Sequence, residues 1–183
     1  FRSVFSDTIN TGIYILEPEV LDYYKKGENF DFSKDLFPRL LKDNIPMYGY
    51  VTDQYWNDIG DINSYIKTHE DLLNKSVYAE FKSEEIDDGV WVGEGTSIER
   101  GVQIIPPVYI GKNCVIKNGT VLESHTVIGD NSYIDNNCSL KRTIMWDGVF
   151  LSKEVEARKA IICDSVQIKD HAKLFEGSVI GSS

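Results

Sequence analysis

Aliphatic residues recur at every sixth position through the second half of the chain, a period that no helix has. The repeat runs unbroken from residue 92 to residue 140 and continues to residue 180 with two steps of five residues. A small or short side chain stands two positions before nearly every one of them, so each unit predicts a short strand followed by a bend. The repeating positions are Val92, Ile98, Ile104, Ile110, Ile116, Leu122, Ile128, Ile134, Leu140, Met145, Leu151, Ala157, Ile162, Ile168, Leu174 and Ile180.

A longer period of 18 residues relates Gly93, Gly111 and Gly129, and likewise Asn113 and Asn131. Three units therefore make one turn, and the sequence predicts about five triangular coils. Gly and Asn fall at the bends, where a positive φ costs them least. Each coil buries its aliphatic face mainly against its neighbours, as in a solenoid. We expect one interior ladder to consist of Val92, Ile110, Ile128, Met145, Ile162 and Ile180.

The repeat resembles the hexapeptide-repeat, left-handed parallel β-helix family over residues 90–181. The left hand is implied by this resemblance and is an exception to the right-handed crossover rule. Two of the three cysteines, Cys114 and Cys138, take the small inward position on different faces of the coil. We therefore interpret them as reduced thiols of the core rather than as a redox pair.

The first half has no repeat and predicts a mixture of helices and strands. The β-branched and aromatic stretch Ile9–Leu16 suits a buried strand, and Glu17–Lys26 suits a helix with Pro in its first turn. Ser33 can cap a second helix. Residues 47–52 and 55–58 are typical of two short strands.

A further helix begins at Asp61, which can act as its N-cap, and its apolar residues share one face. His69 belongs to that apolar face, so a structural role is expected for it rather than a ligand's role. A polar connector, residues 75–89, leads into the repeat. We accordingly divide the chain into residues 1–88 and residues 89–183, the first mixed α/β and the second all-β.

The net charge of −10 lies mostly in the first of these two parts, with −9 in residues 1–88 and −1 in residues 89–183. Such a chain would repel a phosphate backbone, so nucleic acid is not an expected partner. No apolar run is long enough to cross a bilayer and no signal peptide opens the sequence. A soluble, cytoplasmic protein without a membrane partner is expected.

Two short motifs in the first part carry candidate chemistry: Asn10-Thr11-Gly12, and Trp56-Asn57-Asp58-Ile59-Gly60. Together with Phe32-Ser33-Lys34-Asp35-Leu36-Phe37-Pro38 they resemble the sugar-nucleotide pyrophosphorylases, in that family's order. These enzymes join a sugar 1-phosphate to a nucleoside triphosphate. With the β-helix attached, and with residues 141–147 resembling part of their coil, the chain is most similar to bacterial mannose-1-phosphate guanylyltransferases.

The resemblance implies a magnesium-dependent transfer in which Mg²⁺ neutralises crowded phosphates. Asp58 matches the family's metal-binding and catalytic aspartate, Asn10 and Gly12 match positions near the sugar, and Trp56 is expected to position Asp58. The alternative for Asp58 is that it only favours the start of the following helix. The alternative for Asn10 and Gly12 is an ordinary turn.

One part of the family pattern is missing. The resemblance implies a Gly-rich phosphate loop and a first metal-binding Asp, and neither is present in residues 1–88. These residues correspond to the closing portion of a Rossmann-like nucleotidyltransferase domain. We therefore expect this chain to have no complete nucleotide site and to be inactive alone, as a fragment of a larger enzyme or a degenerate descendant. The absence of an initial Met favours the fragment.

Three functions of different classes remain open from the sequence. In the first, the parent enzyme converts GTP and mannose 1-phosphate to GDP-mannose and pyrophosphate, with glucose 1-phosphate and ATP, UTP or dTTP as alternatives. The second is a hexapeptide acyltransferase with His125 or His171 as general base, although surface histidines are the simpler interpretation. The third is a non-catalytic regulatory or assembly module, a homo-oligomer formed through the β-helix.

Overall fold

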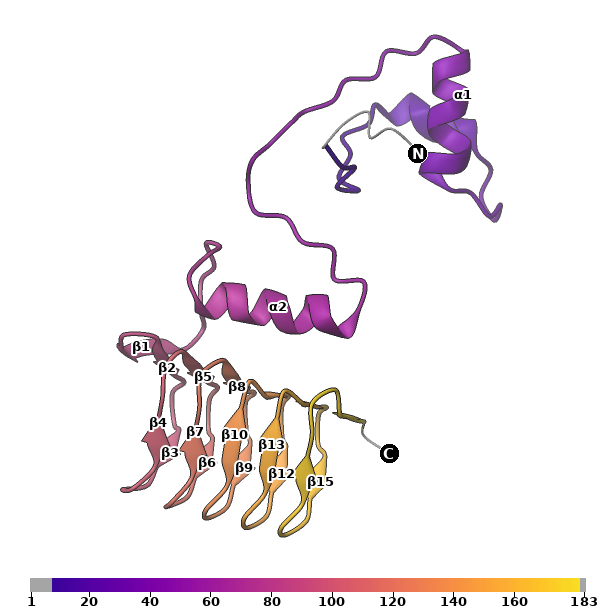
Figure 1. Cartoon of the computed structure of the whole chain (residues 1–183). Helices are drawn as coiled ribbons and strands as arrows, with labels where there is room; N and C mark the ends of the chain where they lie inside the picture. Colours follow the sequence, from indigo (N-terminus) through magenta and orange to yellow (C-terminus); the bar gives the residue numbers. More distant parts are fainter. Residues whose placement is uncertain (1–7, 182–183) are drawn as a thin grey trace, which may run out of the picture. The chain divides into compact units, whose positions relative to one another are not determined.

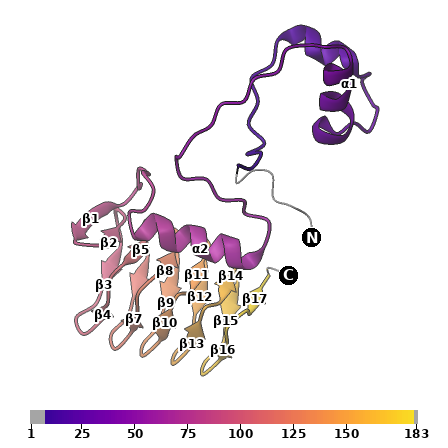
Figure 2. The same ribbon diagram turned by 45° about the horizontal axis from the view of Figure 1, so that its top comes forward.

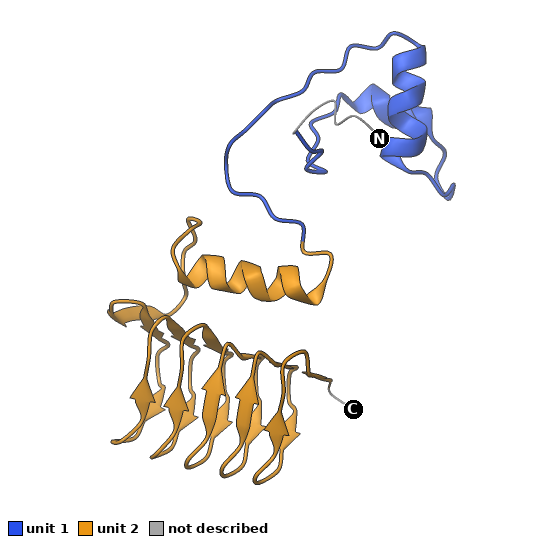
Figure 3. Cartoon of the chain, in the orientation of Figure 1, with its two compact units in different colours: residues 1–58 blue, residues 59–183 orange. Residues whose placement is uncertain are grey.

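The computed structural model describes residues 8–181, which fall into two compact units that divide between Asp58 and Ile59 (Figure 3). Each unit has its own buried residues. The division after residue 88 in the sequence analysis was based on family resemblance and not on packing, and it stays a prediction. In packing, the helix after Asp61 groups with the repeat and not with the residues before it.

The first unit contains three short helical segments: a 3₁₀-helix η1, Pro18–Tyr23, a π-helix η2, Phe32–Leu36, and the α-helix α1, Phe37–Lys42. Leu36 and Leu40 are its buried aliphatic residues. The rings of Tyr14 and Phe37 meet edge to face at 5.0 Å between centroids. This small aromatic and aliphatic cluster is the core of the first unit.

The second helix of the sequence analysis is confirmed, but its cap is not Ser33. The Asp31 carboxylate accepts the Lys34 backbone N–H at 2.8 Å, one turn before the chain becomes α-helical. The expected helix Glu17–Lys26 is reduced to the six residues of η1. None of the residues of η1 is fully buried, so little packing is available to lengthen it.

The three strands predicted in the first unit are wrong. Residues 9–16, 47–52 and 55–58 form no strand, and Ile13 and Tyr48 are 77% and 93% exposed. A strand is stable only when its backbone pairs with a neighbouring strand and one face is buried. No such neighbour exists among residues 8–58, so the β-forming side chains there lack a sheet to join.

The second unit is a solenoid of short strands with one long helix along one side, above the coils in Figure 1. The helix α2 spans Ile62–Leu73. The strands are β1 Glu84–Asp87, β2 Val90–Val92, β3 Ser97–Ile98, β4 Gln103–Ile104, β5 Val108–Ile110, β6 Val115–Ile116, β7 Val121–Leu122, β8 Thr126–Ile128, β9 Tyr133–Ile134, β10 Ser139–Lys141, β11 Ile144–Met145, β12 Phe150–Leu151, β13 Glu156–Arg158, β14 Ile161–Ile162, β15 Gln167–Ile168, β16 Lys173–Leu174 and β17 Val179–Ile180.

Between residues 90 and 180 these strands form the three faces of a prism. One sheet has the order β2-β5-β8-β11-β14-β17, the second β3-β6-β9-β12-β15 and the third β4-β7-β10-β13-β16, all parallel. Every third strand thus returns to the same face, one coil further on (Figure 1). The parallel β-helix predicted for the second part of the chain is confirmed.

The interior ladder is confirmed residue by residue. Ile110 pairs with Ile128, Ile128 with Met145, and Met145 with Ile162, so the two short steps of the repeat are absorbed without loss of register. These four side chains are at most 1% exposed. The spacing of six residues therefore identified the positions that fill the core.

Glycine is required where successive coils touch at a corner. A Cβ on Gly129 would lie 2.5 Å from the carbonyl carbon of Trp146, closer than atoms can approach. The neighbouring corner positions instead need a positive φ, which Asn113 and Asn131 supply at 52° and 57°. The 18-residue period of Gly and Asn is therefore a stacking requirement.

The connector is partly structured, because β1 pairs antiparallel with β2 and covers the first edge of the prism. The Phe81 ring lies against Trp91 at 4.6 Å, and the buried Ser83 hydroxyl donates to the Ile110 carbonyl at 3.0 Å. The connector predicted as an extended polar segment is therefore anchored on the first coils.

Helix α2 covers the outer side of the seven-stranded sheet that β1 completes (Figure 2). Asp61 caps it as predicted, accepting the Ser64 N–H at 2.7 Å. Ile66 is 5% exposed and packs on Ile144 and Ile161, which point outward from the sheet. No helix in residues 8–181 is long and apolar enough to cross a membrane.

We predict that Ile66→Ala detaches α2 while the prism persists, because it removes a buried side chain worth about 2–4 kcal/mol only at the helix contact. Amide hydrogen exchange should accelerate roughly tenfold or more in residues 62–73 and stay slow in the core strands. Ile62→Ala is the matched control, since Ile62 is 46% exposed on the same helix. Equal exchange in the two variants would show that Ile66 does not hold the helix.

Candidate functional site

The Asn10-Thr11-Gly12 motif forms a local turn in the first unit. The Asn10 Oδ1 accepts the Gly12 N–H at 3.0 Å, and Gly12 has a φ of 75°. The Asn10 amide also donates to the Tyr14 hydroxyl at 2.8 Å. This is the arrangement of an Asx-turn, the alternative that the sequence analysis left open for these residues. A role for Asn10 and Gly12 near a sugar stays a prediction.

Asp58 closes the first unit and is exposed. Among the described residues it forms no hydrogen bond or ion pair with Asn10 or Gly12, so the structure does not bring the predicted site residues together. Trp56, two residues earlier, is 38% exposed. The N-cap of α2 is Asp61. The N-cap is thus supplied by another residue, and both the catalytic, metal-binding role of Asp58 and the alternative of a charge that favours the helix start stay predictions.

The magnesium implied by the resemblance can be tested against the side chains present. Mg²⁺ takes six oxygen ligands in near-octahedral geometry, of which a protein site usually supplies one or two carboxylates beside substrate phosphates. Within residues 8–181 no three His, Cys, Asp or Glu side chains lie together as a metal site. A lone exposed Asp58 does not fit a magnesium site by itself.

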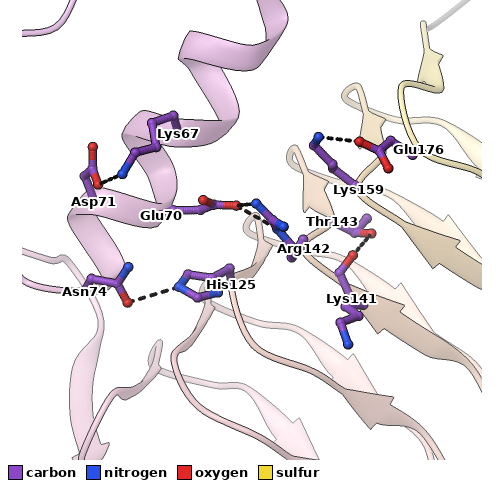
Figure 4. A network of polar contacts seen from close by, with 10 residues as sticks. All are labelled: Lys67, Glu70, Asp71, Asn74, His125, Lys141, Arg142, Thr143, Lys159 and Glu176. Atoms are coloured by element: carbon purple, nitrogen blue, oxygen red, sulfur yellow. Dashed lines mark hydrogen bonds and ion pairs between the residues drawn. The ribbon is translucent and has the colours of Figure 1, made fainter.

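A polar network in the second unit fixes helix α2 on the corner that precedes the covered sheet (Figure 4). The Arg142 guanidinium donates through Nε and Nη2 to one carboxylate oxygen of Glu70, at 2.8 and 2.5 Å. The Glu70 side chain is only 14% exposed. One coil earlier, His125 Nε2 lies 3.0 Å from the Asn74 side-chain oxygen at the C-terminus of the helix.

A direct contact also joins the opposite flank of the helix to the sheet. The Trp146 indole N–H donates to the Tyr65 hydroxyl at 3.0 Å, across 81 residues of sequence. These contacts were not predicted. A signal for a covering element existed, however, because Val127, Ile144 and Ile161 are apolar at the outward position of three successive coils of one face.

The histidines proposed as acyltransferase bases have different surroundings. His171 is an exposed corner residue whose Nδ1 lies 3.0 Å from a Glu154 carboxylate oxygen, as expected of a surface histidine. His125 is partly buried, and its Nε2 contacts Asn74 of the α2 C-terminus. Both adopt a positive φ, of 62° for His125 and 60° for His171.

The cysteines are confirmed as core residues. Cys114 and Cys138 are at most 1% exposed, and all three cysteines carry free thiols. Burial raises the pKa of Cys114 and raises that of Cys138 to about 11, so both stay protonated and unreactive near neutral pH.

A threefold parallel solenoid of six-residue units, with free thiols in its core, defines a protein of the left-handed β-helix class. Residues 87–183 match the family described as the EIF2B subunit epsilon LbH domain, and residues 2–75 match the family described as nucleotidyl transferase. The chain therefore belongs, through residues 87–183, to the EIF2B subunit epsilon LbH domain family, and its residues 2–75 are similar to nucleotidyl transferases.

Two curated relatives are similar to this chain in sequence. A UTP–glucose-1-phosphate uridylyltransferase from Synechocystis sp. is 36% identical over 135 residues, which cover 63% of this chain and 35% of that protein. A mannose-1-phosphate guanylyltransferase from Mycobacterium tuberculosis is 29% identical over 113 residues, which cover 55% and 32%. The chain thus spans about a third of the length of these relatives.

Among solved structures, a hexapeptide transferase family protein from Anaplasma phagocytophilum is similar to the repeat. It is 16% identical, with a TM-score of 0.47, and the match covers 50% of this chain and 58% of that one. A likeness of this size says nothing about acyl transfer by the present chain.

We predict that His125 makes stability fall between pH 8 and pH 5.5. Burial lowers its pKa, Arg142 and Lys67 lower it further, and Glu70 opposes them. Below its ordinary pKa of about 6.5 the unfolded chain binds a proton that the folded chain resists, so acid favours unfolding in this range. His125→Asn, which tolerates the positive φ, should lose less stability over this range in urea titrations. Coinciding profiles would contradict the prediction.

Proposed function

We propose that the protein containing this chain is a sugar-1-phosphate nucleotidyltransferase. The observation that carries the proposal is the order of the two family matches, a nucleotidyl transferase segment at residues 2–75 followed directly by the β-helix at residues 87–183. Both curated relatives are named for transfer of a nucleotidyl group to a sugar 1-phosphate.

In the proposed reaction an oxygen of the sugar phosphate attacks the α-phosphorus of a nucleoside triphosphate. The bond from that phosphorus to the bridging oxygen of the β-phosphate breaks, and pyrophosphate leaves in line. Asn10 and Gly12 are proposed to recognise sugar hydroxyls, and Asp58 to supply a catalytic carboxylate. Because these groups do not converge in the described residues, we expect this chain alone to be inactive.

The proposed Mg²⁺ belongs to the longer protein, with Asp58 as one of its ligands. Asp58 does not hold a metal alone, so no step of the proposed reaction is assigned to the metal. Homo-oligomer formation through the β-helix, the absence of a nucleic-acid partner and a cytoplasmic location also stay predictions.

The substrate pair is the finer part of the proposal. GTP and mannose 1-phosphate are the pair expected from the sequence, and a guanylyltransferase is among the relatives. The relative with 36% identity is named for UTP and glucose 1-phosphate instead. The residues of the described chain do not read the base, so an assay must decide.

We expect Asp58→Asn to lower kcat roughly 100-fold or more in the longer natural protein, because a carboxylate is replaced by a neutral group of the same shape. Pyrophosphate release measures the rate, and circular dichroism checks the fold. Asp53→Asn is the matched control, an exposed aspartate five residues earlier in the same unit. Unchanged turnover in Asp58→Asn would remove Asp58 from the site.

A grid of GTP, UTP, ATP and dTTP against mannose 1-phosphate and glucose 1-phosphate tests the substrate pair on the same longer protein. We expect the highest kcat/KM for GTP with mannose 1-phosphate. A preference for UTP with glucose 1-phosphate would overturn this pair but keep the nucleotidyltransferase. No pyrophosphate release with any pair would overturn the proposed function.

A further inference from the structure

A groove of about 390 Å³ lies between helix α2 and the corner that follows the covered sheet. Tyr65 and His69 line it from the helix, and Trp146, Asp147 and Asp164 line it from two successive coils. It is on the opposite side of α2 from the Glu70–Arg142 pair. Nothing in the proposed nucleotidyl transfer uses this groove, so its role is independent of that function.

The groove has a rigid aromatic wall. The Trp146 ring is 42% exposed, and its only hydrogen-bonding group, the indole N–H, already donates to the Tyr65 hydroxyl at 3.0 Å. The Tyr65 and His69 rings pack edge to face at 4.4 Å. The exposed faces of Trp146 and Tyr65 are therefore held in place, and a flat or cationic group can stack on them.

His69 and Asp147 offer hydrogen-bond acceptors to the groove, and the Tyr65 hydroxyl, which accepts the Trp146 N–H, keeps its own O–H as a donor. His69 Nδ1 lies 2.9 Å from the Tyr65 carbonyl oxygen, which can only accept, so Nδ1 carries the hydrogen and Nε2 of the neutral ring is an acceptor. Asp147 accepts the Asp130 backbone N–H through Oδ1, which leaves its second oxygen for another donor. A ligand that suits this groove must donate hydrogen bonds.

The charge of the groove is also uncompensated. Asp147 and Asp164 occupy the same place in successive coils, because Met145 pairs with Ile162. In the described chain neither Asp147 nor Asp164 takes part in an ion pair. By contrast, carboxylates on the other flank of the helix and on the sheet beyond it are paired. Those pairs are Glu70 with Arg142, Glu123 with Lys141, Glu156 with Lys173 and Glu176 with Lys159. The groove therefore favours a cation.

We propose that this groove binds an arginine side chain of a partner polypeptide. A guanidinium group is planar, so it stacks on Trp146, and its five N–H donors reach the Asp147 and Asp164 carboxylates from the same plane. A lysine ammonium lacks the flat face. A neutral sugar would leave the two carboxylates without a counter-charge.

The test follows the indole N–H resonances of the chain by NMR. Trp146→Phe assigns the Trp146 signal, and Trp56 and Trp91 serve as internal controls. The probes are the pentapeptide acetyl-Gly-Gly-Arg-Gly-Gly-amide, the same peptide with lysine or with neutral citrulline, acetyl-arginine amide, and methyl mannoside. The arginine peptide should move the Trp146 signal alone. It should bind at least fivefold more tightly than the lysine or citrulline peptide, and more tightly than acetyl-arginine amide.

Matched variants test the charges. Asp147→Asn with Asp164→Asn should weaken the arginine peptide about fivefold or more, the size expected for two exposed charge pairs, while the Asn side chains keep the backbone contacts. Asp130→Asn is the control, since Asp130 has the same place one coil earlier and does not line the groove. It should change binding less than twofold.

Several outcomes would overturn the proposal. Equal binding of the citrulline or lysine peptide would show that the groove does not recognise a guanidinium group. Equal binding of acetyl-arginine amide would show that the ligand is a small guanidinium compound and not a polypeptide. A Trp146 shift with methyl mannoside alone makes the groove a sugar site. An unchanged affinity in the double Asn variant, or no shift with any probe, shows that the carboxylates bind no such partner.

Discussion

Two apolar ladders on opposite faces of one sheet hold the second unit together. The inward ladder runs through Ile110, Ile128 and Met145, and the outward ladder runs through Ile144 and Ile161. A coil of the prism cannot bury its aliphatic residues alone, so the inward ladder couples each coil to its neighbours. The outward ladder would be an exposed apolar patch without a cover, and α2 supplies that cover. The sheet is thus buried on both faces, whereas the other two sheets of the prism are not.

Helix α2 consequently belongs to both parts of the chain. By sequence it lies within the segment that matches the nucleotidyl transferases, residues 2–75, but by packing it belongs to the compact unit that begins at Ile59. A boundary placed where the repeat begins would cut the helix from the sheet it covers. The connector supports the same conclusion, because Phe81 and Ser83 attach to the first coils. The physical domain is therefore larger than the repeat.

The sequence predicted best what depends on local or periodic order. The interior ladder and the Asp61 cap follow from spacing and from one side chain, and both are confirmed. The strand at Ile9–Leu16 failed because a strand needs partners that no local signal can supply. The contact of His125 with Asn74 joins residues 51 apart, so no window of sequence contains it. The roles predicted for Asp58, Asn10 and Gly12 stay untested.

The position of α2 along its sheet needs more than the apolar contact. Hydrophobic burial is non-directional, so Ile66 on Ile144 and Ile161 would tolerate a helix shifted or rotated over the patch. Directional contacts on both flanks remove that freedom. Arg142 holds Glu70 on one side and Trp146 holds Tyr65 on the other, from corners before and after the same strand. Because the Arg142 side chain is 42% exposed, its pair with Glu70 adds little free energy, and it specifies the helix register more than it stabilises the fold. The same register fixes Tyr65 and His69 over the groove.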